Sequence, residues 1–144
     1  MSELLAWIEA HPVTTVIAIA VALLAARGLW QWLTRQYTPI SAADAGDRLH
    51  DGRTWFLDVR TPAELRHGQI PGALHIPVTQ LKGRLDELGE RVGEAPVVVY
   101  CHSGLRSARA AHVLTRSGFS EVYNLRGGVM AWQSQDLPMT EHHG

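Results

Sequence analysis

Cysteine is almost absent from this chain of 144 residues, in which Cys101 is the only one. A single cysteine excludes an internal disulfide, so the burial of apolar side chains must stabilise the fold. A free thiol also fits a reducing compartment. The formal net charge of −1 gives no indication of a nucleic-acid partner. The chain has no internal repeat and no low-complexity tract, and its length suits one domain of ordinary size.

Charged side chains are missing from residues 12–26, which are apolar or weakly polar throughout. A helix that spans a membrane needs about 20 such residues. Arg27 can extend its guanidinium to the membrane surface, and the apolar character continues to Leu33. We therefore expect residues 1–36 to be a membrane anchor that contacts lipid, with a span over about 12–33. Aromatic side chains on both flanks suit the membrane interface: Trp7, Trp30, Trp32 and Tyr37.

Three other interpretations of this segment fit less well. A cleaved signal peptide needs a basic start, whereas this chain begins with Glu3 and Glu9 and has no Lys or Arg before the apolar run. A helix in the core of a domain, or one lying in the membrane surface, needs a polar face. The apolar run offers none beyond Thr14 and Thr15.

The arginines give the expected orientation of the span. Arg27 and Arg35 follow it directly, and no Lys or Arg precedes it. Under the positive-inside rule the C-terminal part faces the cytoplasm. We expect a single-pass protein of the plasma (inner) membrane, with its reactive thiol on the reducing side.

The remainder of the chain, from Tyr37 onward, alternates between strand-like and helix-like segments. The run 97–101 is apolar throughout, which indicates a strand buried on both faces at the centre of a parallel sheet. The pattern predicts an α/β fold with a mainly parallel sheet. Strands are expected at 54–59, 74–76, 97–101 and 121–125, and helices at 42–50, 78–91, 107–117 and 129–134, with a further helix start at Thr61.

Cys101 lies where the central strand should enter a short loop and then a helix. Ligands bind at this edge of an open α/β sheet, and the start of a helix offers backbone N–H groups to an anion. Gly104 permits a backbone conformation that other residues disfavour, and Arg106 adds a full positive charge. A cysteine here should have a lowered pKa and act as a nucleophile without a general base. The alternative is a buried, chemically inert thiol.

A series of short motifs runs through the chain from about residue 38 to residue 137: Leu57–Arg60, Glu64, Gly68–Ala73, Ile76–Pro77, Val98–Ser107, Gly118–Phe119, Leu125–Gly128 and Ala131–Trp132. In their residues and their order they resemble the rhodanese homology domain. The family usually has His at the position of Gln69 and Tyr or Phe at that of Leu65. The layout resembles small bacterial membrane-anchored, single-domain rhodaneses, with residues 37–144 as the rhodanese domain.

The resemblance implies a five-stranded parallel sheet flanked by helices and a sulfurtransferase that needs no cofactor. By this resemblance Cys101 attacks the outer sulfur of an anionic donor such as thiosulfate and becomes a persulfide. A small thiol, a protein thiol or cyanide then collects the sulfur. Arg106 would bind the sulfonate end of the donor. The substrate-binding residues implied are His102, Ser103, Gly104, Leu105, Arg106 and Ser107.

Charged residues near the expected site are interpreted as structural. Asp58, Arg60 and Glu64 would support the site, with Arg60 and Glu64 forming an ion pair. His142 and His143 lie in a terminal segment without further ligands at suitable spacing, so no metal site is expected.

Two other functions remain open. The six residues from Cys101 to Arg106 match the loop length of sulfurtransferases, whereas related phosphatases have a loop that is one residue longer. This length disfavours a phosphatase or an arsenate reductase. A membrane-tethered adaptor or a sulfide or redox sensor is the second alternative. The intact pair of Cys101 and Arg106 disfavours an inactive domain.

Overall fold

The computed structural model describes residues 1–34 and 36–140. The chain divides into two compact units, Met1–Arg35 and Gln36–Gly144, and each is described by itself.

The first unit consists of two helices, α1 (Ser2–Ala10) and α2 (Pro12–Leu33). Helix α2 has 22 residues, so at about 1.5 Å per residue it is about 33 Å long, close to the thickness of a bilayer core. An 18-residue stretch of α2 has a mean hydropathy of 1.9, and none of that stretch is buried within the protein. By length and composition α2 fits a membrane span or a signal sequence. The sequence did not predict α1.

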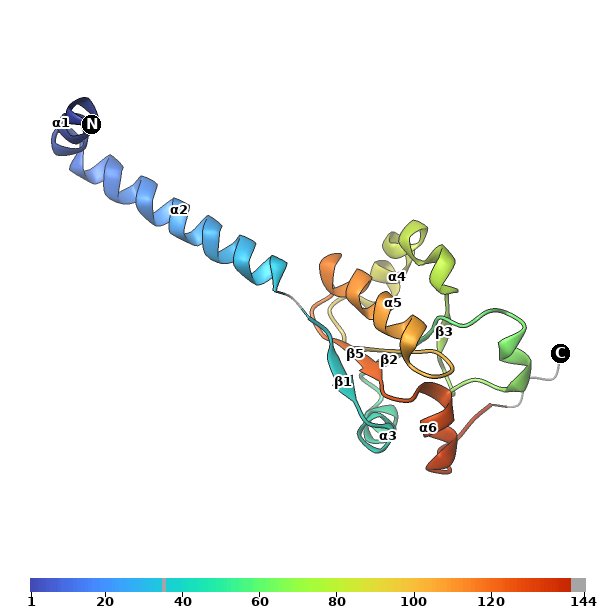
Figure 1. The fold of residues 1–144 in the computed structure, drawn as a ribbon. Coiled ribbons are helices and arrows are strands. Elements are labelled where there is room, and N and C mark those ends of the chain that lie inside the picture. The colour runs from blue at the N-terminus through green and yellow to red at the C-terminus, as the bar shows by residue number, and fades with distance from the viewer. Residues whose placement is uncertain (35, 141–144) are drawn as a thin grey trace. The chain divides into compact units, whose positions relative to one another are not determined.

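The second unit is built on one five-stranded sheet in which every pairing is parallel (Figure 1). The strand order β1-β5-β4-β2-β3 places β4 in the middle. The predicted α/β fold with a five-stranded parallel sheet and a buried central strand is therefore confirmed. The strands are β1 (Thr38–Ile40), β2 (Trp55–Asp58), β3 (Leu74–His75), β4 (Val97–Tyr100) and β5 (Val122–Leu125).

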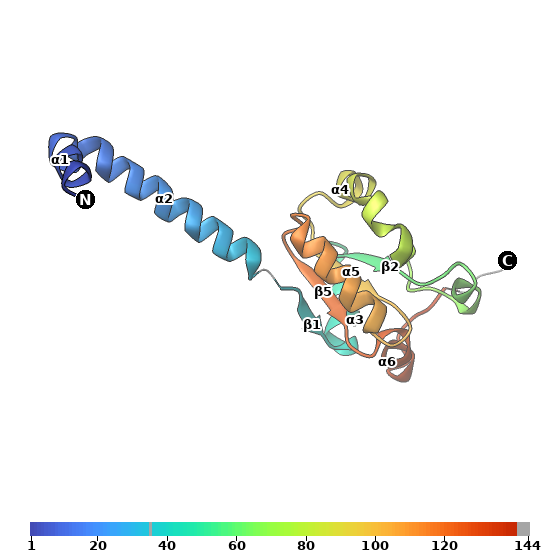
Figure 2. The same cartoon turned by 45° about the horizontal axis from the view of Figure 1, so that its top comes forward.

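Helices cover both faces of the sheet, with α4 and α5 on one face and α3 and α6 on the other (Figures 1 and 2). Successive side chains of a strand point to opposite faces, so β4 contributes Val97 and Val99 to one core and Val98 and Tyr100 to the other. The helices are α3 (Ala42–Asp51), η1 (Glu64–His67), η2 (Val78–Gly83), α4 (Leu85–Val92), α5 (Leu105–Arg116) and α6 (Gly128–Ser134), of which η1 and η2 are 3₁₀ helices.

Two helix predictions differ from the structure. The helix expected over 78–91 is broken into η2 and α4, because Gly83 weakens a helix and the backbone of Arg84 is not helical. The helix expected to start at Thr61 is the short η1. Its carboxylate cap is present, since Glu64 accepts the Thr61 N–H at 2.9 Å, but Gly68 ends the element at a φ of 102°.

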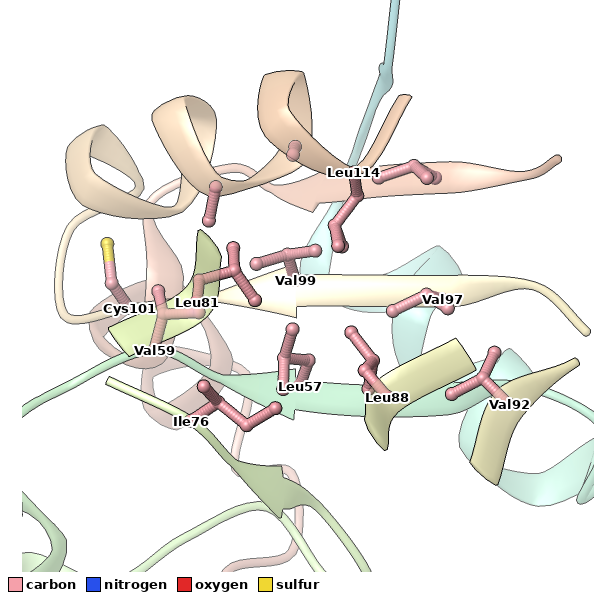
Figure 3. Close-up of a cluster of buried hydrophobic side chains, with 13 residues drawn as sticks. Leu57, Val59, Ile76, Leu81, Leu88, Val92, Val97, Val99, Cys101 and Leu114 are labelled. Carbon is pink, nitrogen blue, oxygen red and sulfur yellow. The ribbon is translucent and has the colours of Figure 1, made fainter. Parts of the chain in front are cut away.

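The core on the α4–α5 face extends to the carboxyl end of β4 (Figure 3). Leu57, Val99 and Leu114 are fully buried at its centre. Cys101 closes this core at the strand end, with its sulfur directed toward the start of the next helix (Figure 3). Apolar packing therefore helps to hold the thiol at the carboxyl end of β4.

Candidate active site

The thiol of Cys101 lies inside a tight turn between β4 and α5. The residue is fully buried, and Gly104 ends the turn with a φ of 101°. A side chain at Gly104 would also come within 3.3 Å of the Gly127 nitrogen and the Leu125 carbonyl oxygen. Glycine is therefore required at this position for both conformation and space.

Hydrogen-bond donors surround the Cys101 sulfur. The backbone N–H groups of Gly104 and Ser107 donate to Sγ at 3.1 and 3.4 Å, and the N–H of Ser103 also faces it. Burial raises the pKa of the thiol, but the bonds from Ser107, Gly104 and Ser103 outweigh burial and leave the pKa below its ordinary value. The turn therefore favours a thiolate, the nucleophilic form of cysteine.

The six residues expected to bind the substrate do not all direct their N–H groups at the sulfur. Within the described residues, no bond joins Sγ to the N–H of His102, Leu105 or Arg106. The side chains of His102 and Leu105 are exposed, the latter to 78%. The turn thus brings three of the six assigned residues to Sγ and turns the side chains of others outward.

Asn124 on β5 anchors the turn from the neighbouring strand. Ser107 Oγ donates to Asn124 Oδ1 at 2.5 Å, and Asn124 Nδ2 donates to the Gly104 carbonyl at 3.2 Å. In the thiol form, Cys101 donates to Ser107 Oγ at 3.4 Å. Once the thiol has lost its proton, the same hydroxyl can rotate and donate to the thiolate. Sequence reasoning missed Asn124, although a polar residue within an apolar strand was an available signal.

The start of α6 holds the other side of the turn. The N–H groups of Val129 and Met130 donate to the carbonyls of Cys101 and His102, at 2.9 and 3.2 Å. A side chain at Gly128 would overlap these same two carbonyls. Gly128, the first residue of α6, therefore borders the site.

Arg106 is paired with Glu64. Its two terminal nitrogens donate to the two carboxylate oxygens at 2.8 and 2.6 Å. Glu64 also accepts the N–H and the hydroxyl of Thr61, each at 2.9 Å. The bonds from Arg106, and secondarily those from Thr61, lower the pKa of Glu64 to about 2. The carboxylate is therefore ionised at neutral pH.

The predicted ion pair between Arg60 and Glu64 is wrong. Arg60 binds Asp58 instead, with a shortest distance of 2.6 Å, and also donates to the Gly68 carbonyl at 2.8 Å. Residues two apart on an extended chain point to the same side, which puts this carboxylate directly beside Arg60. Both side chains are buried, whereas Arg60 reaches only the backbone carbonyl of Glu64, at 3.5 Å.

The described part of the chain has no cluster of side chains suited to binding a metal ion. Residues 1–34 and 36–140 contain no group of three or more His, Cys, Asp or Glu side chains that could hold a metal ion. His142 and His143 lie outside the described residues.

Comparison with known proteins agrees with this geometry. A family model described as a rhodanese-like domain matches residues 41–135. A sulfurtransferase of Allochromatium vinosum is 39% identical over 106 residues, which are 73% of this chain and 96% of the relative. The uncharacterized protein YibN of Escherichia coli is 26% identical over 140 residues, which are 96% of this chain and 97% of the relative.

Solved structures show the same fold. A rhodanese-related protein from Thermoplasma volcanium superposes with a TM-score of 0.66 at 30% identity, covering 74% of this chain and all of the other. The relative named sulfurtransferase supports sulfur transfer as the chemistry of the family. On its fold, its matched residues and these relatives, the chain belongs to the rhodanese-like domain family.

Proposed function

We propose that this protein is a sulfurtransferase in which Cys101 accepts a sulfur atom as a persulfide and passes it to a thiol. One observation carries the proposal. The Cys101 sulfur lies at the carboxyl end of the central strand within a ring of hydrogen-bond donors, the Ser107 hydroxyl and the surrounding backbone N–H groups, that lowers its pKa. Such a ring stabilises negative charge on sulfur in both the thiolate and the persulfide.

In the first step the Cys101 thiolate attacks the outer sulfur of the donor. A new S–S bond forms with the electron pair of the thiolate. The S–S bond of the donor breaks, and its electron pair leaves with the remainder of the donor, which is sulfite when the donor is thiosulfate. The product is Cys101–S–S⁻, whose terminal charge the N–H groups of Gly104 and Ser107 stabilise.

In the second step an acceptor thiolate attacks the terminal sulfur of the persulfide. The acceptor gains the sulfur, and the Cys101 thiolate leaves with the electron pair of the broken bond. Cyanide can replace the thiol and leaves as thiocyanate. Ser107 and Asn124 keep the turn in one conformation through both steps, because their bonds tie it to β5.

Mass spectrometry of the intact full-length chain in detergent tests this proposal. Incubation with a sulfane-sulfur donor should add one sulfur atom, and a thiol reductant should remove it. Since Cys101 is the only cysteine, Cys101→Ser should take up none. An unchanged mass under donor excess, or uptake by the variant, would contradict the proposal.

We also propose that α2 anchors the protein in the plasma (inner) membrane, with the rhodanese domain in the cytoplasm. The apolar character of α2, the acidic start and the arginine that follows the apolar run support this placement. Thr14 and Thr15 fit an apolar surrounding, since both hydroxyls donate to the His11 carbonyl.

Alkaline extraction of membranes and a C-terminal reporter test the anchor. The intact chain should stay in the membrane fraction, and the reporter should be active only in the cytoplasm. A mature protein that begins after α2 would identify the segment as a signal sequence instead.

A further inference from the structure

Helix α1 has an apolar face that the described residues of the chain leave exposed. At about 100° per residue, its large apolar side chains fall within one arc of about 160°, and its polar and small side chains fill the rest. None of its residues is buried, and Leu4, Leu5 and Trp7 are 60%, 57% and 51% exposed. A continuous apolar face of this kind marks a surface that contacts another molecule or phase. The apolar face consists of Leu4, Leu5, Trp7 and Ile8, and the polar face of Ser2, Glu3, Ala6, Glu9 and Ala10.

The junction between α1 and α2 is a hydrogen-bonded turn at a single residue, His11. Its backbone angles are not helical (φ −131°, ψ 60°), so α1 does not continue the direction of α2 (Figures 1 and 2). Its N–H donates to the Trp7 carbonyl at 3.0 Å, and its carbonyl accepts the Thr15 N–H at 3.0 Å. Its ring stacks on that of Trp7, with the centroids 4.8 Å apart. The backbone groups of His11 are therefore paired, as a place with little water requires.

This short junction indicates what covers the apolar face. Because one residue separates the two helices, a bilayer that contains α2 also brings α1 to its surface. The carboxylates of Glu3 and Glu9 would enter the hydrocarbon only at a large cost, which prevents α1 from extending the span. Trp7 lies on the apolar face close to the junction, and indole rings favour the level of the lipid headgroups. A lipid surface is therefore the partner that fits this face.

We propose that α1 lies in the membrane surface at the N-terminal end of the span, with its apolar face among the lipid chains and its carboxylates in water. The inference rests on the proposed membrane anchor and adds a second lipid contact of a different kind. Helices with one apolar and one polar face bind membranes at the boundary between headgroups and chains. Residues 2–10 contain no Lys or Arg, so the binding depends on apolar burial and needs no anionic lipid.

Thiol reactivity along α1 provides the first test. The full-length chain carries Cys101→Ser, which removes its only cysteine, and receives one new cysteine at a time. It is inserted into phosphatidylcholine nanodiscs at one chain per disc, so that a charged maleimide reaches both membrane surfaces and a second copy cannot protect the helix. Ala6→Cys and Ala10→Cys should react at least about 10-fold faster than Leu4→Cys and Ile8→Cys, because a thiol in apolar surroundings is a poor nucleophile.

The tested positions alternate between the two faces along the chain. A helix that entered the membrane end-on would instead give rates that fall steadily from residue 4 to residue 10, and this result would contradict the proposal. After denaturation in guanidinium chloride all of these variants should react at similar rates. The difference in rate then depends on the folded helix in the membrane and not on the neighbouring residues.

A charge placed on the apolar face provides the second test. Leu5→Glu should release α1 from the membrane surface, so that Ile8→Cys in the same chain reacts as fast as Ala10→Cys without this change. Ala6→Glu adds the same charge to the polar face. In this matched control Ile8→Cys should stay protected.

The outcomes separate this inference from the proposed anchor. Ala20→Cys, within α2, should not react in the nanodiscs, and fast reaction there would refute the anchor together with this inference. With Ala20→Cys protected, equally fast rates along α1 would place the helix in water, and equally slow rates would place it in the hydrocarbon. Either result would overturn the inference while the anchor stands. Protection of Ile8→Cys that persists beside Leu5→Glu would also overturn it.

Discussion

The candidate site has two regions that use the same kinds of group in different surroundings. We call Asp58, Arg60, Ser107 and Asn124 the base of the site, and Glu64, Arg106, His67 and His102 its rim. In the base, the side chains of Arg60 and Asp58 are 3% and 0% exposed, whereas those of Arg106 and Glu64 in the rim are 36% and 31% exposed.

Because the two regions differ in burial, the loss of a charged partner has different consequences in each. A charge in the base has no access to water, so removal of its partner leaves a large desolvation cost. A charge in the rim can exchange its partner for water or for a ligand at little cost. The base can therefore hold the turn in one conformation, and the rim can adjust to what binds.

Arg60→Ala should show the largest effect, because it leaves the buried Asp58 carboxylate without its partner. We expect a loss of about 3–5 kcal/mol in the free energy of unfolding, measured by denaturant titration of the detergent-solubilised chain. Arg84→Ala, in the exposed pair with Glu87, is the control and should have a much smaller effect. Equal losses in the two variants would remove the distinction between base and rim.

Asn124→Leu should have the next largest effect. It removes an acceptor from Ser107 and a donor to the Gly104 carbonyl, and both groups are buried. Each buried polar group left without a partner costs about 1–3 kcal/mol, and the turn should lose its fixed conformation. We expect lower stability and slower sulfur uptake by Cys101, measured by denaturation and by mass. Unchanged sulfur uptake would show that the link to β5 does not position the turn.

Ser107→Ala should change the thiol more than the fold. The hydroxyl stabilises the thiolate, so its loss should raise the pKa of Cys101. Alkylation by iodoacetamide at neutral pH should then slow, and its pH profile should shift upward. The single cysteine makes this measurement specific. Ser103→Ala, whose side chain is exposed, keeps its backbone N–H and should react like the wild type.

The sequence predicted the strands of the sheet better than it predicted the side-chain contacts of the site. The apolar run 97–101 implied a central parallel strand, and the structure confirms it, because burial on both faces leaves a direct signature in the sequence. The partner of Glu64 could not be predicted in this way. Arg106 is 42 residues away along the chain, and only the folded sheet brings the two side chains together.

The same limit explains why Asn124 was missed. Its partner Ser107 is 17 residues away and lies on the helix that follows the neighbouring strand. Local patterns predict strands, turns and the position of Cys101, whereas side-chain contacts between elements depend on register. The roles of Cys101 and Arg106 in sulfur transfer stay predictions.

Glu64→Gln should have the smallest effect on stability, and its pH dependence identifies it as a rim residue. The pKa of Glu64 is about 2 in the folded protein and about 4.3 in an unfolded chain. A lowered folded pKa adds stability that is complete above the unfolded value and is lost as the pH falls from about 4.3 toward 2. Because the pair is partly exposed, this contribution should be only about 1 kcal/mol.

The wild type should therefore exceed Glu64→Gln in stability by a constant, small amount above about pH 5. The difference should shrink at lower pH and also in high salt, which screens exposed charges. Denaturant titration at about pH 7, 5 and 3 measures it, because the first two values lie above the window of about 4.3 to 2 and the third lies within it. A large difference that persists at pH 3 and in high salt would mean that Glu64 behaves like the buried Asp58, and the rim would then be as rigid as the base.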